Sequence, residues 1–165
     1  MSKDAIVLLK QDHQEVRRQF RAFRKPDPTP VQKQTVVDTI LELLTVHTYI
    51  ENEVMYPRVR ELLPDLEDDV LESYEEHHVA DVLRVELAAM DATDDRFVAK
   101  TTVLMENVEH HMDEEEQDWF PKVRAGLGRK QLQELGEELL EARERAPRRP
   151  EQPSAVKKAI DAVIS

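Results

Sequence analysis

Hydrophobic residues recur along this chain every three or four positions, a spacing typical of amphipathic helices rather than strands. The pattern predicts five helical runs, at about residues 4–24, 31–63, 66–90, 96–125 and 130–145. Prolines, an Asp-rich turn and two glycines separate them, and each interrupts a helix. Long helices joined by short loops pack in antiparallel fashion. The chain is therefore predicted to be all-α, an up-down-up-down four-helix bundle with additional C-terminal helices.

The bundle is expected to occupy residues 1–128 as one domain. The leucine-rich fifth helix, at residues 129–146, is expected to pack on or near it. Residues 147–165 are predicted to form a Pro-rich linker and a short C-terminal helix that begins after Ser154. This tail is basic, so it could fold back on the acidic bundle or dock on a protein partner.

The amino-acid composition excludes several kinds of binding partner and metal site. The 165 residues carry 23 Lys and Arg against 35 Asp and Glu, a net charge of −12. This balance predicts no binding to nucleic acid or to an anionic membrane surface. No cysteine is present, which excludes disulfides and thiolate metal sites. The sequence shows no apolar run that could span a membrane and no signal-peptide pattern, so a cytoplasmic protein is expected.

Two segments 64 residues apart repeat one polar pattern. His47 is followed by Glu four positions later and by Pro ten positions later, and His111 is followed by the same residues at the same offsets. The same shift places Asp12-His13 on Glu76-His77. Each of the first four predicted helices therefore carries one element of the pattern. The candidate metal ligands are His13, His47, Glu51, His77, His111 and Glu115.

The candidate ligands lie on the predicted apolar faces of their helices. His47 and Glu51 continue an apolar stripe that ends at Val54, and His111 and Glu115 continue that of the fourth run. A buried carboxylate is costly unless it is paired or bound to a metal. Imidazole and carboxylate together suit iron or manganese. Four His and two Glu exceed the needs of one structural zinc and match two bridged metal ions.

The constellation resembles the hemerythrin-like, HHE cation-binding family, over about residues 4–125. The resemblance implies a four-helix bundle around two iron ions with a bridging oxide or hydroxide. Glu51 and Glu115 would bridge the irons, and the four histidines would be terminal ligands. Manganese or a mixed pair is compatible with the same ligand types. The motifs that carry the resemblance are Asp12-His13, His47-Thr48-Tyr49-Ile50-Glu51 with Tyr56-Pro57, Glu76-His77, and His111-Met112-Asp113-Glu114-Glu115 with Trp119-Phe120-Pro121.

One position departs from the oxygen-carrying members, which have a fifth histidine four residues from the third-helix ligand. Here Ser73 and Asp81 stand at those offsets from His77. The departure disfavours reversible oxygen carriage and favours binding, sensing or decomposition of O2, H2O2 or NO, with catalase-like turnover as the enzymatic form. A metal-dependent sensor or interaction module and an iron-binding protein without turnover remain alternatives. A metal-free structural bundle would leave the two glutamates without partners.

The sequence contains two pairs of adjacent histidines, His77-His78 and His110-His111. Which member of each pair is the candidate ligand is left open. The repeat selects His77, whereas the apolar stripe of the third run is centred nearer His78. His110 also begins an HxxxE pattern but lies off the apolar stripe, so His111 is preferred.

Other polar residues near the candidate ligands are expected to support the site. Tyr74, one turn from the third-helix ligand, is interpreted first as a core aromatic, with a hydrogen bond to an oxygen ligand or binding to ferric iron as the alternative. Tyr49 and Tyr56 are interpreted as packing residues. The residues expected to orient the imidazoles are Asp12, Glu76 and Asp38.

Overall fold

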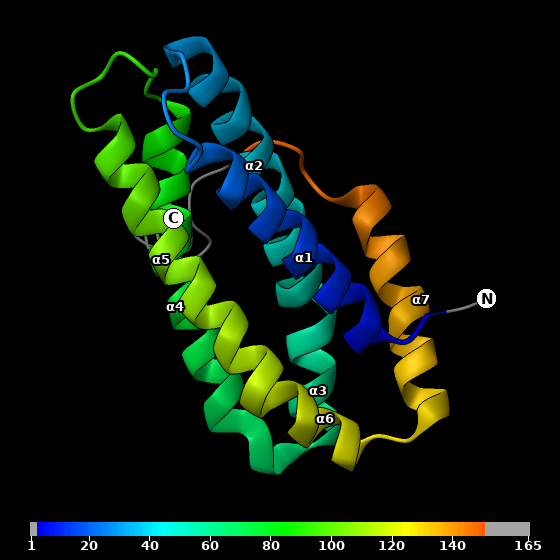
Figure 1. Ribbon diagram of the computed structural model, residues 1–165. Coiled ribbons are helices and arrows are strands. Elements are labelled where there is room, and N and C mark those ends of the chain that lie inside the picture. Colours follow the sequence, from blue (N-terminus) through cyan, green and yellow to red (C-terminus); the bar gives the residue numbers. More distant parts are fainter. Residues whose placement is uncertain (1–2, 151–165) are drawn as a thin grey trace, which may run out of the picture.

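The computed structural model describes residues 3–150, which are almost wholly helical and contain no strand (Figure 1). Two helical hairpins, α1–α2 and α4–α5, form an antiparallel four-helix bundle, and a fifth long helix, α7, packs on α1 and α2. The prediction of an all-α bundle with an additional helix is confirmed. The long helices are α1 (Ala5–Phe23), α2 (Pro30–Ile50), α4 (Glu67–Ala88), α5 (Phe97–Glu114) and α7 (Arg129–Arg145).

Capping residues mark the positions where the first two helices begin. Asp4 caps α1 by accepting a hydrogen bond from the backbone N–H of Val7 at 2.9 Å. Thr29 and Gln32 form a reciprocal capping box at the start of α2. Between these helices, Asp27 takes the left-handed conformation, with φ of 53°. The break predicted between the first two helices is therefore observed.

Two of the predicted helices continue through a π-helical turn. The first such turn, η1 (Glu51–Met55), joins α2 to α3 (Tyr56–Leu62), and a short 3₁₀ segment, η2 (Pro64–Leu66), leads into α4. The second, η3 (Glu115–Trp119), joins α5 to α6 (Phe120–Gly126). Each π turn begins at one of the two candidate bridging glutamates.

Proline accounts for the position of these turns. Pro57 and Pro121 occupy the second positions of α3 and α6, where they do not break the helix. A proline inside an α-helix crowds the carbonyl four residues earlier, and the wider π turn relieves that contact. The backbone N–H of Tyr56 bonds to the carbonyl of Glu51, five residues back. The extra residue shifts the inward face, so Tyr56 is buried and Val54 is only half-buried.

The bundle core consists of two apolar clusters. One lies where α1, η1, α3, η3, α6 and α7 meet and includes Leu9, Met55 and Phe120. The other lies among the opposite ends of the four bundle helices and includes Val16, Ile40 and Leu104. His13 lies on α1 between Leu9 and Val16, so a polar layer separates the clusters.

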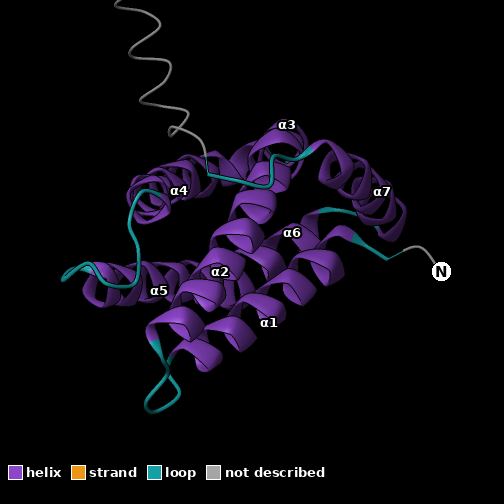
Figure 2. Cartoon of the chain, turned by 90° about the horizontal axis from the view of Figure 1, so that it is seen from above, coloured by secondary structure: helices purple, strands orange, loops and turns teal. Residues whose placement is uncertain are grey.

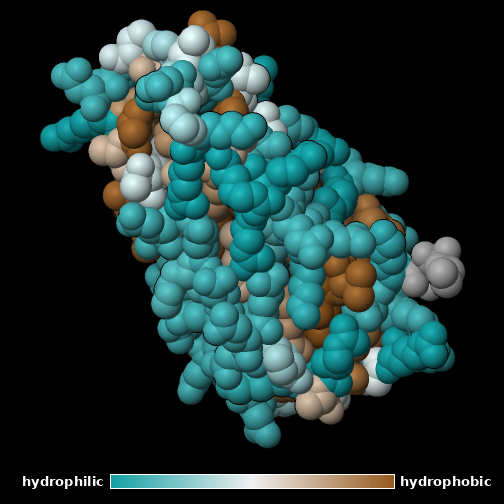
Figure 3. Space-filling view, in the orientation of Figure 1, coloured by the Kyte–Doolittle hydropathy of each residue, from teal (hydrophilic) through white to brown (hydrophobic). Residues whose placement is uncertain are grey.

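The helix α7 covers only one side of the bundle. It packs against α1 and α2, on the side away from α4 and α5 (Figures 1 and 2). The face shown in Figure 3 is mostly hydrophilic, with an apolar strip where α7 lies beside α1. Within residues 3–150, no helix has the length and hydropathy that a membrane span requires. The short helix predicted after Ser154 lies outside the described residues.

Candidate metal centre

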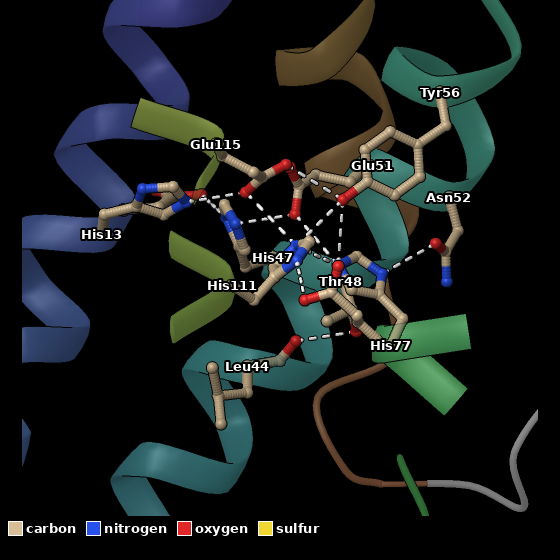
Figure 4. Close-up of polar contacts among 12 residues, drawn as sticks. His13, Leu44, His47, Thr48, Glu51, Asn52, Tyr56, His77, His111 and Glu115 are labelled. Atoms are coloured by element: carbon tan, nitrogen blue, oxygen red, sulfur yellow. Dashed lines mark hydrogen bonds and ion pairs between the residues drawn. The ribbon is translucent and has the colours of Figure 1, made fainter. Parts of the chain in front are cut away.

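All six candidate ligands converge in the polar layer of the bundle (Figure 4). The four histidines come one each from α1, α2, α4 and α5, and the two glutamates are the first residues of the π turns. The six residues are at most 8% exposed. The structure therefore brings together, away from solvent, the residues that the repeat predicts.

One group of side chains surrounds a first position. His13, His47, Glu51 and Glu115 each offer a ligand atom, and these atoms all lie within 4.8 Å of one another. The Nε2 atom of His47 lies 2.8 Å from Oε1 of Glu51, and that of His13 lies 3.3 Å from Oε1 of Glu115. Two imidazole nitrogens and two carboxylates thus face one point.

A second position lies beside the first. The Nε2 atoms of His77 and His111 are 3.1 Å apart. The first of these nitrogens lies 3.4 Å from Oε1 of Glu51, and the second lies 3.4 Å from Oε1 of Glu115. Both carboxylates therefore lie between the two histidine pairs, as bridging ligands would.

Carboxylates orient the imidazole rings of His47 and His111, the histidines of the two HxxxE segments. Asp12 Oδ2 lies 2.9 Å from Nδ1 of His47, and Glu76 Oε2 lies 3.2 Å from Nδ1 of His111. Both residues were expected to orient imidazoles. Such contacts leave Nε2 free for a metal. Asp38 does not take part, since it accepts a hydrogen bond from Gln34 instead.

The other two histidines have partners that the sequence interpretation missed. Asn52 Oδ1 lies 2.9 Å from Nδ1 of His77, and Glu116 Oε1 lies 3.3 Å from Nδ1 of His13. Asn52 and Glu116 are related by the same 64-residue shift, and each follows a candidate bridging glutamate. That coincidence is the signal from which they could have been found. Each reaches across to the other half of the repeat.

Unpaired polar atoms test whether a metal fits. Within the described residues, the buried Nε2 atoms of His13 and His47 lie at ion-pair distance from Glu115 and Glu51 but form no hydrogen bond of acceptable angle. Both carboxylate oxygens of Glu51 and Oε1 of Glu115 likewise form no hydrogen bond there. Buried polar atoms are costly without partners. Because this unpaired set consists of nitrogen and oxygen ligand atoms that face one another, a cation fits it at the first position. At the second position, the Nε2 atoms of His77 and His111 lie close to each other and to Glu51, a further group of ligand atoms that could hold an ion.

The electrostatics of the metal-free centre are asymmetric. Burial and the charge of Glu51 raise the pKa of the Glu115 carboxyl. Burial alone would raise the pKa of Glu51 too, but His47 and His77 lower it well below the usual range. Burial lowers the pKa of His77 to about 4. His77 is thus held neutral and Glu51 is held ionised, the forms in which these side chains bind a metal.

Tyr56 is a polar residue of the centre that was interpreted as packing alone. It does pack in the apolar core, but its phenol oxygen lies 3.0 Å from Nε2 of His77 and 3.2 Å from Nε2 of His111. The hydroxyl donates a hydrogen bond to Oε2 of Glu115 at 3.0 Å. Burial raises the pKa of Tyr56 well above its usual range, so the phenol keeps its proton. The Tyr74 hydroxyl donates to the backbone carbonyl of Asn52 at 3.5 Å, and its ring packs against Tyr56, as the preferred interpretation of a core aromatic expects.

Phe120 occupies the repeat position equivalent to Tyr56. Its ring stacks on His13, with centroids 5.7 Å apart and an interplanar angle of 16°. Only the position next to His77 and His111 therefore has a phenol. The difference is visible in the aligned segments, where Tyr-Pro faces Phe-Pro.

The remaining candidates lie outside the cluster. His78 is half-buried and absent from both ligand groups, and the His110 side chain is 71% exposed and pairs with Glu114. Asp81, at one fifth-histidine offset, pairs with the buried Arg84. Ser73, at the other offset, is buried and carries only a neutral hydroxyl. Neither offset therefore supplies a further ligand.

Comparison with known proteins accords with this arrangement. A family model for the hemerythrin HHE cation binding domain matches residues 4–123. The chain belongs to this family. Its fold is also similar to the crystal structure of a hemerythrin HHE cation binding domain-containing protein from Mycobacterium kansasii. The TM-score is 0.71 at 21% identity, and the likeness covers 87% of this chain and 86% of the other.

A second relative of this HHE domain is a curated protein from Nostoc sp. that is named DNA nickase. The two are 27% identical over 143 residues, which is 86% of this chain but 40% of the Nostoc protein. The chain therefore spans less than half the length of that relative. What the hemerythrin HHE membership and the buried cluster establish together is a metal-binding domain of the hemerythrin type.

Proposed function

We propose that this protein holds a non-haem di-iron centre and that it binds, senses or decomposes a small oxidant: O2, H2O2 or NO. The observation that carries the proposal is the direction of the ligand atoms. Four Nε2 atoms and two carboxylates face one another, while polar side chains face every Nδ1 atom. His13 and His47 would hold one ion, His77 and His111 the other, and Glu51 and Glu115 would bridge them.

A bound iron pair would supply Lewis-acid and one-electron redox chemistry. The chain itself positions and protects that chemistry. Its two apolar clusters pack on opposite sides of the polar layer. Tyr56 holds a proton at its phenol oxygen, within hydrogen-bond distance of both His77 and His111. That proton can stabilise an oxygen or nitrogen atom of a small ligand.

The space beside the centre supports a small ligand. A narrow cavity of about 20 Å³ is lined by His47, His77 and His111, together with Leu44 and Arg84. A volume of this size accommodates about one water molecule. A diatomic molecule or peroxide matches the dimensions of this inner cavity.

Metal content tests the centre. Protein reconstituted anaerobically with Fe²⁺ and desalted is expected to hold about two irons per chain, each located by anomalous scattering beside one histidine pair. The E51A/E115A double variant should fold, as judged by circular dichroism, and lose both ions. Folded wild-type protein that remains iron-free after reconstitution would contradict the proposal.

Peroxide turnover separates the forms of the proposal. In catalase-like chemistry, two H2O2 give two H2O and one O2. The iron-loaded protein is expected to release O2 faster than the same concentration of free iron. If it binds iron without releasing O2, the alternatives of a sensor or a non-turnover iron protein hold. A sensor would then show metal-dependent protease sensitivity in its basic C-terminal tail.

The Nostoc relative is named DNA nickase, but our proposal includes no cleavage of DNA. A net charge of −12 disfavours binding to the DNA backbone.

A further inference from the structure

The internal repeat gives the centre two equivalent flanks, and α7 covers only one of them. On the covered flank, leucines of α7 such as Leu135 and Leu139 pack in one cluster with Leu9, Ile50 and Met55. The other flank lies between α4 and the α5–η3 segment and opens as a cleft of about 240 Å³. His111 and Glu115 form part of its lining, so this cleft connects the surface with the candidate centre.

The open flank is acidic where its counterpart is apolar. Among the residues that line the cleft are Asp69, Glu72, Glu114 and Asp118. The positions 64 residues earlier hold only apolar side chains. They are Ala5, Leu8, Ile50 and Val54. An uncovered face needs polar residues, but either sign of charge would serve, and all four here are acids.

The basic side chains that contact these acids are exposed. Lys122 is exposed and lies 3.5 Å from Asp69 and 3.1 Å from Asp118. His110, likewise exposed, lies 3.0 Å from Glu114. Carboxylate oxygens of Glu72, Glu76 and Glu114 lie within 4.8 Å of one another. This carboxylate triad is held close together, with Glu76 also contacting His111.

One buried polar atom among the lining residues is not accounted for by the proposed centre. Trp119 is 4% exposed, and its indole N–H has no partner within the described residues. A water molecule in the shell of a hydrated cation can accept from this N–H, because each bound water keeps a lone pair beyond the one that faces the metal. Glu115 also lines the cleft, but its Oε1 atom belongs to the centre, where it lies 3.3 Å from Nε2 of His13.

We propose that Glu72, Glu76 and Glu114 form an entry site for a hydrated divalent cation, Fe²⁺ or Mn²⁺, on its way to His111 and Glu115. This inference rests on the proposed metal centre. The triad offers oxygen alone, a ligand set that hydrated Mn²⁺ and Fe²⁺ accept. The ion then moves to a centre that adds imidazole nitrogens, which bind these metals more strongly. The acidic field raises the local cation concentration and repels anions.

The rate of metal uptake tests the entry site. Wild type and the E72Q/E114Q variant are mixed anaerobically with Fe²⁺ in 20 mM salt, and a chromogenic chelator measures the iron that remains free over time. The variant is expected to fill about fivefold more slowly, since electrostatic focusing raises association rates by roughly ten- to a thousandfold. Its final iron content should match that of wild type. In 0.5 M salt the two rates should converge, because screening shortens the range of the field.

A matched control removes the same charge elsewhere. Glu137 and Glu144 are exposed on α7, away from the cleft. E137Q/E144Q changes the net charge as E72Q/E114Q does, and its uptake is expected to match that of wild type. Equal uptake by wild type and E72Q/E114Q at low salt would overturn the proposal. So would equal slowing in the control, because net charge would then account for the effect.

A second probe reports on the cleft without depending on the centre. Tb³⁺ is a hard cation that prefers oxygen ligands, and Trp119, the one tryptophan of the chain, lines the cleft. Excitation of this indole is expected to sensitise terbium emission in wild type and in E137Q/E144Q, and not in E72Q/E114Q. If wild type takes up no iron, the proposed centre fails, and the terbium result alone decides the entry site. Terbium emission that survives in E72Q/E114Q would contradict it.

Discussion

Arg143 on α7 donates hydrogen bonds to both carboxylate oxygens of Asp12, at 3.0 and 2.9 Å. Asp12 in turn faces Nδ1 of His47 at 2.9 Å. Burial alone would raise the pKa of Asp12, but His47 and Arg143 together lower it, so the carboxylate stays ionised. The fifth helix therefore contacts a candidate metal ligand through one intervening side chain.

The first prediction concerns this contact. In R143A, Asp12 loses a charged partner and holds the imidazole of His47 less firmly. We expect iron affinity to fall about threefold to tenfold, near the lower end of the effects of removing outer-shell partners. The measurement is a competition titration against a chelator. R145A, which removes an exposed arginine of the same helix, should bind iron as wild type does. Equal losses in the two variants would contradict a specific role for Arg143.

The second prediction concerns the phenol of Tyr56. The Y56F variant should fold and load iron normally, because Phe already occupies the equivalent position 120. If the protein decomposes peroxide, we expect the rate of O2 release to fall tenfold or more, since a positioned proton donor contributes roughly a hundredfold or more. Y74F serves as the control, because the Tyr74 hydroxyl reaches only the carbonyl of Asn52. A loss in Y74F without one in Y56F would show that the assignment is wrong.

The third prediction concerns metal removal. A ligand that binds only the folded state stabilises it, by about 2.7 kcal/mol at a hundred times its Kd. We therefore expect iron loading to raise the Tm by several degrees and chelation to reverse the rise. Calorimetry measures both changes. The E51A/E115A variant should show the same Tm with and without iron. A metal-dependent rise in that variant would place the binding site elsewhere.

The fourth prediction concerns the packing of α7. Gly136 lies against the backbone at the start of α1, and a Cβ atom there would collide with the carbonyl oxygen of Lys3. G136A is expected to destabilise the fold by about 1–3 kcal/mol, as overpacking does. Denaturant unfolding measures the change. A Cβ atom at Gly128 meets no atom within 4 Å, so G128A should cost less. A smaller cost for G136A than for G128A would contradict the packing argument.

Much of this protein could be predicted from local patterns in its sequence. Apolar periodicity and helix-breaking residues predict the bundle, because both act within a few positions of the chain. The 64-residue repeat predicts the residues that converge, since equivalent positions of two helical hairpins face the same layer. The repeat was also the better guide to His77 than the apolar stripe, which was centred nearer His78.

Only the tertiary structure decided how the two halves differ. The π turns add one residue to the inward face, a change that a 3.6-residue period does not contain, and so they bring Tyr56 to the centre. Asn52 and Glu116 orient histidines of the opposite half, contacts that depend on how the hairpins pack. The placement of α7 covers one flank and leaves the other open. Sequence alone thus determined the symmetric set of candidate ligands, and packing between distant segments decided how the surroundings of the two histidine pairs differ.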